Sequence, residues 1–158
     1  MKKYYFLFLI LLFSFSCICG SSNVVYADLP LTGKLIIIDP GHGGADPGTM
    51  SGKTYEKDIN LKISLALDSE INKLGGSVIL TRKGDYDLAS PESYWRKRSD
   101  FDNRINLINN SKADLYISIH LNYLSNPNYS GPQVFYNKDN QKLAEIVQKY
   151  LNKNLNNK

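Results

Sequence analysis

The chain has two histidines, His42 and His120, and each closely follows a short apolar segment. The segments are residues 35–38 (LIII) and residues 115–119 (LYISI), and such runs are typical of buried strands in a parallel sheet. Open α/β sheets bind their ligands at the carboxyl ends of the strands. We therefore expect both imidazole rings at one edge of a sheet, where together they indicate a metal site.

A zinc site with two histidines needs a carboxylate as a third protein ligand, because catalytic zinc commonly has three protein ligands and leaves a fourth position to water. Asp39 and Asp46 are near His42 in the sequence, but side chains at these offsets in a tight turn need not point towards the same ion. Glu56 is better placed, because it begins a helix that follows a glycine-rich loop from the sheet edge. We predict His42, Glu56 and His120 as the metal ligands.

Zinc in such a site would lower the pKa of a bound water towards about 7 and polarise a carbonyl group, which suits the hydrolysis of an amide. Two of the ligands also have a structural explanation when each is taken alone. A glutamate in the first turn of a helix, such as Glu56, is favoured by the helix dipole, and His120 could be a hydrogen-bonded core residue. The prediction therefore depends on the three residues together.

The rest of the sequence predicts strands that alternate with helices. An amphipathic helix is expected over residues 57–74, because apolar residues recur on one face and a Gly-Gly pair follows. A second helix should begin at Pro91, with Ser90 as its N-cap, and end near Asn110. The other expected elements are strands at residues 35–38, 77–81, 114–120 and 133–136 and a last helix from residue 139 to about 155. This order predicts an α/β fold, a three-layer sandwich with a mostly parallel twisted sheet flanked by helices.

A polar loop is expected at the edge of the sheet over residues 82–89. We expect Arg82 and Asp85 to form an ion pair with each other there, in preference to binding an anionic substrate.

The first 27 residues have the pattern of a secretory signal peptide. Two lysines precede the apolar segment 5–18, and Val25-Tyr26-Ala27 provides a cleavage site with small residues. We favour a cleaved signal over an uncleaved anchor, because a membrane span needs about 20 apolar residues. Residues 28–33 are then a linker and residues 34–158 one domain, exported and associated with the membrane at most transiently through its N-terminal segment.

The net charge and the cysteine content exclude two further classes of protein, nucleic-acid-binding proteins and disulfide-stabilised or thiolate-metal proteins. The formal net charge is +4, and it is +2 without Lys2 and Lys3, which is too low to indicate nucleic-acid binding. Cys17 and Cys19 are the two cysteines, and both lie in the signal segment, where a lipoprotein anchor is the weaker reading. The exported domain therefore has neither disulfides nor thiolate metal ligands. Nothing in the sequence indicates the oligomeric state.

Four segments together resemble the zinc-dependent N-acetylmuramoyl-L-alanine amidases of the amidase_3 family. They are residues 39–44 (DPGHGG), 56–58 (EKD), 80–82 (LTR) and 118–122 (SIHLN), and the resemblance extends from residue 34 to about residue 151. It implies Zn²⁺ as cofactor and hydrolysis of the bond between N-acetylmuramic acid and L-alanine in peptidoglycan. It also implies that His42, Glu56 and His120 bind the zinc ion. For Asn122 it suggests contact with substrate or with a metal ligand, although we favour a cap at the strand end.

Three longer segments resemble the germination-specific amidases of endospore-forming bacteria more closely. They are residues 81–88 (TRKGDYDL), 108–120 (INNSKADLYISIH) and 130–136 (SGPQVFY). These enzymes remove peptides from muramic acid in the spore cortex, so the resemblance implies a role in sporulation and germination. It places the protein on the cell-wall or spore-cortex side of the membrane.

The family normally continues through another strand, with a catalytic glutamate in a Val-Glu-x-Gly-Phe type segment. No such segment precedes Lys158, and Glu70, Glu92 and Glu145 lie in no matching motif. We therefore expect a domain that is incomplete at the C-terminus, with no catalytic base among the 158 residues, weakened activity and an exposed sheet edge.

Two other functions remain open at this point. One is a zinc-holding, catalytically silent fragment that binds the cell wall or pairs with a separate chain that supplies the last strand. The other is a zinc peptidase that uses the same ligand set but cleaves between amino acids.

Overall fold

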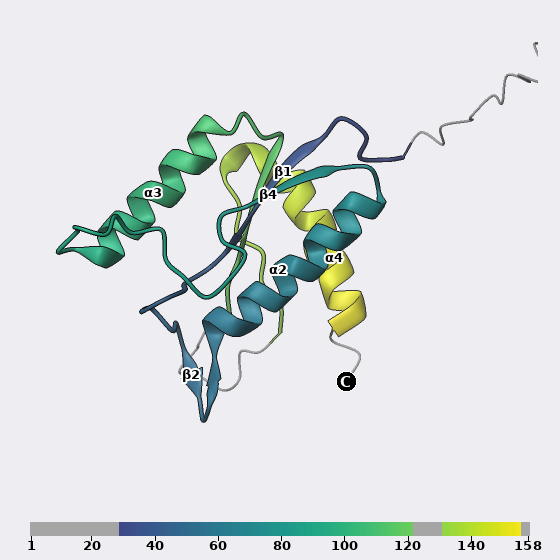
Figure 1. Cartoon of the computed structure of the whole chain (residues 1–158). Helices are drawn as coiled ribbons and strands as arrows, with labels where there is room; N and C mark the ends of the chain where they lie inside the picture. The colour runs from purple at the N-terminus through teal and green to yellow at the C-terminus, as the bar shows by residue number, and fades with distance from the viewer. Residues whose placement is uncertain (1–28, 122–130, 156–158) are drawn as a thin grey trace, which may run out of the picture.

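The computed structural model describes residues 29–121 and 131–155, which form an α/β fold (Figure 1). The strands are β1 (Leu35–Pro40), β2 (Met50–Ser51), β3 (Thr54–Tyr55), β4 (Ser77–Leu80) and β5 (Leu115–Ile119). The helices are α2 (Glu56–Lys73), α3 (Arg96–Asn110), the short 3-10 helix η1 (Lys138–Asn140) and α4 (Gln141–Leu155). The predicted signal segment and Asn122 lie outside the described residues. No helix in the described ranges has the length and apolar character needed to cross a membrane.

Strands β4, β1 and β5 form a parallel sheet in that order, which confirms the predicted α/β class. The central strand β1 is buried almost throughout, as expected for an apolar strand between two neighbours. Pro40 at the end of β1 pairs with Ile119 at the end of β5, and Gly41 N donates to Ile119 O at 2.9 Å. The chain segments that carry His42 and His120 therefore leave the sheet at the same edge.

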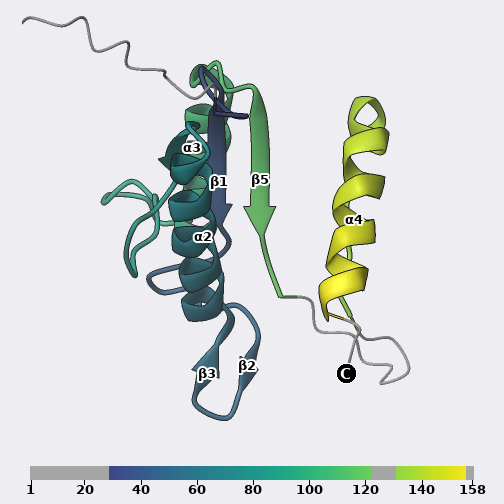
Figure 2. The same cartoon turned by 90° about the vertical axis from the view of Figure 1, so that its right-hand side faces the viewer.

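Helices cover both faces of this sheet, and the side chains of β1 alternate between them. Ile36 and Ile38 face α2, where they form the apolar core with Ile71 and Leu80. On the opposite face, the carboxylate of Asp39 on β1 pairs with a guanidinium group of α3. Figures 1 and 2 show α2 and α3 on either side of the sheet. This arrangement provides the layers of the predicted sandwich.

Helix α2 buries a different set of residues from the one that its apolar pattern predicts. Ile63 and Leu74 belong to the apolar face of the predicted helix, yet they are 42% and 43% exposed, whereas Asn60 and Ser64 are fully buried. The reason is that the first half of α2 packs under the polar loop after β1, where Asn60 Nδ2 donates to Gly41 O at 3.2 Å. The apolar contact with the sheet is confined to the later turns of the helix.

The prediction that the next helix begins at Pro91 is wrong, because α3 begins at Arg96. The loop before α3 folds back along the helix and forms hydrogen bonds with it. Asp100 accepts a hydrogen bond from Leu88 N at 2.7 Å, and Ser99 Oγ accepts one from Ser90 N at 3.0 Å. Residues 91–95 must reverse the chain direction to allow this, so they form turns and bends instead of a first helical turn.

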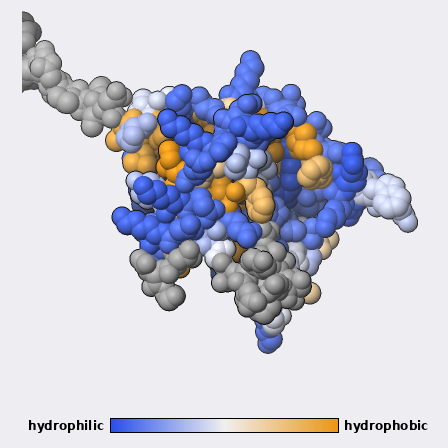
Figure 3. Space-filling view, turned by 180° about the vertical axis from the view of Figure 1, so that it is seen from behind, coloured by the Kyte–Doolittle hydropathy of each residue, from blue (hydrophilic) through white to orange (hydrophobic). Residues whose placement is uncertain are grey.

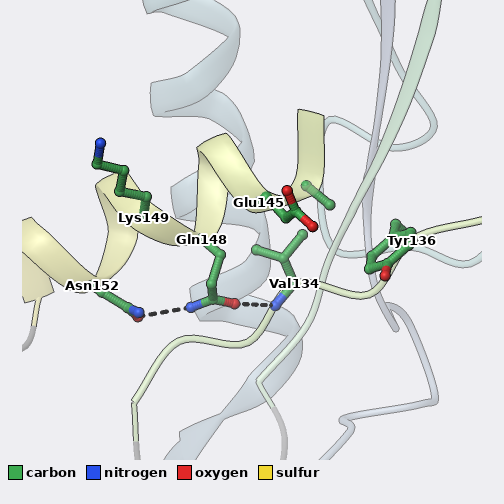
Figure 4. A pocket seen from close by; sticks show the side chains of 7 residues that line it. Val134, Tyr136, Glu145, Gln148, Lys149 and Asn152 are labelled. Carbon is green, nitrogen blue, oxygen red and sulfur yellow. Dashed lines mark hydrogen bonds between the residues drawn. The ribbon is translucent and has the colours of Figure 1, made fainter. Parts of the chain in front are cut away.

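The prediction of a strand at residues 133–136 is also wrong, because this segment pairs with no strand among the described residues. It lies along α4, where Gln148 satisfies its backbone: Val134 N donates to Gln148 Oε1, and Gln148 Nε2 donates to Pro132 O, each at 2.8 Å. Figure 4 shows the hydrogen bond between Gln148 and Val134 beside a pocket of about 340 Å³, and this pocket shares no residue with the histidine site.

Helix α4 stands beyond β5 in Figure 2, and its apolar side is largely exposed. Ile146 and Tyr150 are 47% and 60% exposed, and Ala144 is the buried residue of this helix. Figure 3 shows that the surface opposite to the view of Figure 1 carries apolar patches among polar side chains.

Candidate metal centre

The loop that follows β1 carries His42 in a left-handed backbone conformation, with φ of 62°. This conformation is uncommon for a residue with a side chain and costs about 1–2 kcal/mol. Two buried arginines compensate by binding the carbonyl groups of the loop. Arg82 donates to Pro40 O at 2.9 Å and to Gly41 O at 3.0 Å, and Arg104 donates to His42 O at 2.8 Å. The position of His42 is therefore defined by the sheet edge, by Arg82 in the loop after β4 and by Arg104 on α3.

The ion pair that the sequence predicts between Arg82 and Asp85 does not form. Arg82 is 1% exposed and binds four backbone carbonyls, including those of Lys57 and Gly84. Asp85 instead accepts hydrogen bonds from Lys57 Nζ at 2.7 Å and from Gly44 N at 2.9 Å. A buried guanidinium group has five donors to satisfy, and carbonyl groups from three segments meet around it: the turn after β1, the start of α2 and the loop after β4.

The structure brings the three residues predicted as ligands into one cluster. Glu56 Oε1 lies 3.2 Å from His42 Nε2 and 3.1 Å from His120 Nδ1. The potential ligand atoms of the three residues lie within 4.8 Å of one another, and no other such group occurs within the described parts of the chain. The two rings meet edge to face, with centroids 4.9 Å apart. One carboxylate oxygen thus lies between two imidazole nitrogens at the carboxyl edge of the sheet.

Glu56 is held as an ionised carboxylate. Its side chain is 4% exposed, and burial alone would raise its pKa, but hydrogen bonds from Thr49 and Leu121 lower the pKa to about 2. Thr49 donates to Oε2 through both its backbone N and its hydroxyl, and Leu121 N donates to Oε1 at 2.9 Å. A carboxylate held in this way is a good anionic ligand and a poor proton acceptor near neutral pH.

The other two carboxylates near His42 in the sequence point elsewhere. Asp39 is buried on the α3 side of the sheet, where it binds Arg104 and Thr81, each at 2.6 Å. Asp46 lies behind the ring of His42 and contacts Nδ1 at 3.0 Å, on the side away from Glu56. Burial opposes its ionisation, but hydrogen bonds from His42 and from the backbone of Gly48 lower its pKa to about 2.

Two glycines allow the ligands to approach this closely. A Cβ atom at Gly41 would lie 2.2 Å from Cε1 of His120. A Cβ atom at Gly48 would lie 2.7 Å from Glu56 Oε2 and 2.7 Å from His42 Cδ2. Such distances are shorter than real Cβ contacts, so the site requires a bare backbone at both positions.

The donor set fits a zinc ion. Two imidazoles and one carboxylate are a common set of protein ligands in catalytic zinc sites. His42 Nε2 and Glu56 Oε1 are 3.2 Å apart, and two acceptor atoms at this distance repel each other unless a proton or a cation lies between them. The His120 side chain is 44% exposed, so the cluster is open to solvent on that side.

Three other glutamates of the described residues, which lie in no family motif, are also outside the metal-ligand group. Glu70 lies in the last turns of α2 and pairs with Lys73, and Glu145 on α4 accepts a hydrogen bond from Gln141. Glu92 is exposed in the loop before α3. None of the three belongs to the metal-ligand group.

Known proteins similar to this chain are amidases. Residues 36–158 match the family model described as N-acetylmuramoyl-L-alanine amidase, Amidase_3. The germination-specific N-acetylmuramoyl-L-alanine amidase of Bacillus subtilis is 44% identical over 135 residues, which are 82% of this chain and 57% of that protein. The probable cell wall amidase LytH of Staphylococcus epidermidis is 37% identical over 128 residues, which are 78% of this chain and 38% of that protein. The chain thus spans less than two thirds of the length of these relatives.

A solved structure is similar as well. The CwlD amidase from Clostridioides difficile, in complex with the GerS lipoprotein, is 40% identical with a TM-score of 0.73, and the match covers 79% of this chain and 70% of that chain.

Proposed function

The chain belongs to the N-acetylmuramoyl-L-alanine amidase family, and on this basis we propose that it hydrolyses the amide bond between N-acetylmuramic acid and L-alanine in peptidoglycan. The observation that carries the proposal is the cluster of His42, Glu56 and His120 at the carboxyl edge of the sheet. The relatives of this chain are named as cell-wall and germination-specific amidases. We therefore propose action in the cell wall or spore cortex after export, with residues 1–27 as the signal segment.

In this proposal His42, Glu56 and His120 hold Zn²⁺. A zinc ion bound there would supply Lewis-acid chemistry, because zinc lowers the pKa of water and polarises a carbonyl group. The residues contribute orientation: Thr49 and Leu121 direct the two oxygens of Glu56, which remains ionised as a ligand. The substrate amide would approach from the solvent-exposed side of His120.

Proton transfer needs a separate base, because both oxygens of Glu56 already accept hydrogen bonds. Among the described residues, no second glutamate lies at the cluster. This observation favours a second candidate function, in which the 158 residues bind zinc and peptidoglycan without hydrolysis.

Product analysis tests the proposed activity and separates the alternatives. Zinc-loaded protein is incubated with peptidoglycan, and the soluble products are analysed by mass spectrometry. Release of stem peptides with a free N-terminal L-alanine supports the amidase, whereas products cleaved between amino acids would show a zinc peptidase. A chain that holds one zinc ion and sediments with peptidoglycan without releasing peptides would support the binding function instead. Glu56→Gln should abolish peptide release. Glu70→Gln, at an exposed position of the same helix, is the matched control and should not.

A further inference from the structure

We propose that Asp46 is a positioning residue that fixes the tautomer of His42, so that the Nε2 lone pair of His42 points into the cluster. This inference rests on the proposed metal centre and identifies a function for a carboxylate that binds no metal itself. Asp46 Oδ2 lies 3.0 Å from His42 Nδ1, while His42 Nε2 lies 3.2 Å from Glu56 Oε1. The two nitrogens of the ring thus face two different carboxylates.

In this arrangement the Asp46 carboxylate requires a hydrogen atom on Nδ1 of His42. Asp46 accepts a hydrogen bond from Gly48 N at its other oxygen, 3.2 Å away, and an ionised carboxylate can only accept. Nδ1 of His42 must therefore carry a hydrogen atom, and with a cation between His42 Nε2 and Glu56 Oε1 the neutral ring keeps its lone pair on Nε2. Histidines that bind metals usually donate their other N–H to a carboxylate or carbonyl group in the same way.

The backbone fixes the place of the Asp46 carboxylate. Gly43 N donates to Asp46 O at 3.0 Å, and Asp46 N donates to Gly43 O at 3.1 Å. These two bonds close a tight turn of residues 43–46 directly after His42. Lys97 on α3 also reaches Asp46 Oδ2 at 3.2 Å, but its side chain is 82% exposed. Exposed ion pairs contribute little to stability. The contact of the Asp46 carboxylate that matters is therefore the one with His42.

Asparagine at this position would disturb the tautomer without changing the size of the side chain. Its amide group would face either His42 Nδ1 or Gly48 N. The first orientation favours a hydrogen atom on Nε2, which blocks the metal-binding nitrogen, and the second sets two donors against each other. Loss of such a partner typically lowers metal affinity by about 10- to 100-fold.

Nitrogen NMR of the imidazole rings tests the proposal directly, because the chain has two histidines. In metal-free wild-type protein at pH 8, the shifts of His42 should report a hydrogen atom on Nδ1. Asp46→Asn should move His42 towards the other tautomer and should weaken Zn²⁺ binding, measured by competition with a chelator, by about 10- to 100-fold. Asp102→Asn is the matched control, since Asp102 pairs with Arg98 on the exposed side of α3, and it should change neither quantity.

Wild-type His42 that lacks a hydrogen atom on Nδ1 would overturn the proposal without any mutation. An Asp46→Asn variant that retains both the tautomer and the zinc affinity would overturn it as well. Lys97→Met should behave like the control, and a loss equal to that of Asp46→Asn would assign the effect to the ion pair instead. Since the tautomer is measured without metal, a correct tautomer in a protein that binds no zinc would contradict the proposed metal centre and leave the role of Asp46 intact.

Discussion

Replacement of Glu56 by glutamine should destabilise the metal-free protein in a pH-dependent manner. The pKa of Glu56 is about 2 in the folded chain, against an ordinary value of 4.5. This difference corresponds to about 3 kcal/mol of folding free energy at neutral pH. Glutamine has the size of the protonated acid but cannot gain the stabilisation that the ionised form receives from Thr49 and Leu121.

The sign of the pH dependence follows from the lowered pKa. A carboxyl group with a lower pKa in the folded state stabilises the fold fully above 4.5, and this contribution is lost as the pH falls towards 2. The free-energy difference between wild type and Glu56→Gln should therefore be about 3 kcal/mol at neutral pH and about 1 kcal/mol near pH 3.

Urea unfolding in the presence of a chelator, followed by circular dichroism, measures this difference at both pH values. Glu70→Gln is the control, because Glu70 is 64% exposed and pairs with Lys73 on the surface of α2. Its effect should remain within about 0.5 kcal/mol at either pH. A Glu56→Gln effect that equals the control, or that is the same at both pH values, would refute the reasoning about the buried carboxylate.

Three other outcomes follow from the same structure. Gly48→Ala should destabilise the fold by at least about 1 kcal/mol in urea unfolding, because φ is 67° and a Cβ atom would meet Glu56 at 2.7 Å. Arg104→Met should cost about 3–5 kcal/mol, because it leaves the buried Asp39 carboxylate without its partner, whereas Arg98→Met on the exposed side of α3 should stay within about 0.5 kcal/mol. Chelation of zinc should abolish peptide release and addition of Zn²⁺ should restore it; release that persists in the chelator would contradict the metal requirement.

The sequence allowed the sheet and the cluster to be predicted, because both follow from short-range patterns. Continuous apolar runs identify β1 and β5 as buried parallel strands, and such strands bring their carboxyl ends to one edge. His42 and His120 follow these strands, so the sequence places both residues at this edge. The choice of Glu56 depended on the expectation that α2 starts near this edge, and the structure places the first residue of α2 there.

Long-range polar contacts could not be predicted in the same way. Arg104 reaches Asp39 and His42 across 65 and 62 residues, and no local pattern indicates such a contact. The apolar periodicity of α2 suggested a continuous core face, whereas the burial of Asn60 depends on the loop that packs above it. The start of α3 was misplaced for a related reason, since side chains within α3 hold the preceding loop in a reversed path.

Anomalous diffraction at the zinc absorption edge, from crystals of the zinc-loaded protein, tests the central claim most directly. The account predicts one strong peak bounded by His42 Nε2, Glu56 and His120, at about 2.0–2.2 Å from the ligand atoms. The peak should be absent from crystals of Glu56→Gln grown at the same zinc concentration. A zinc ion bound elsewhere in the wild-type protein, with none among these three side chains, would contradict the account.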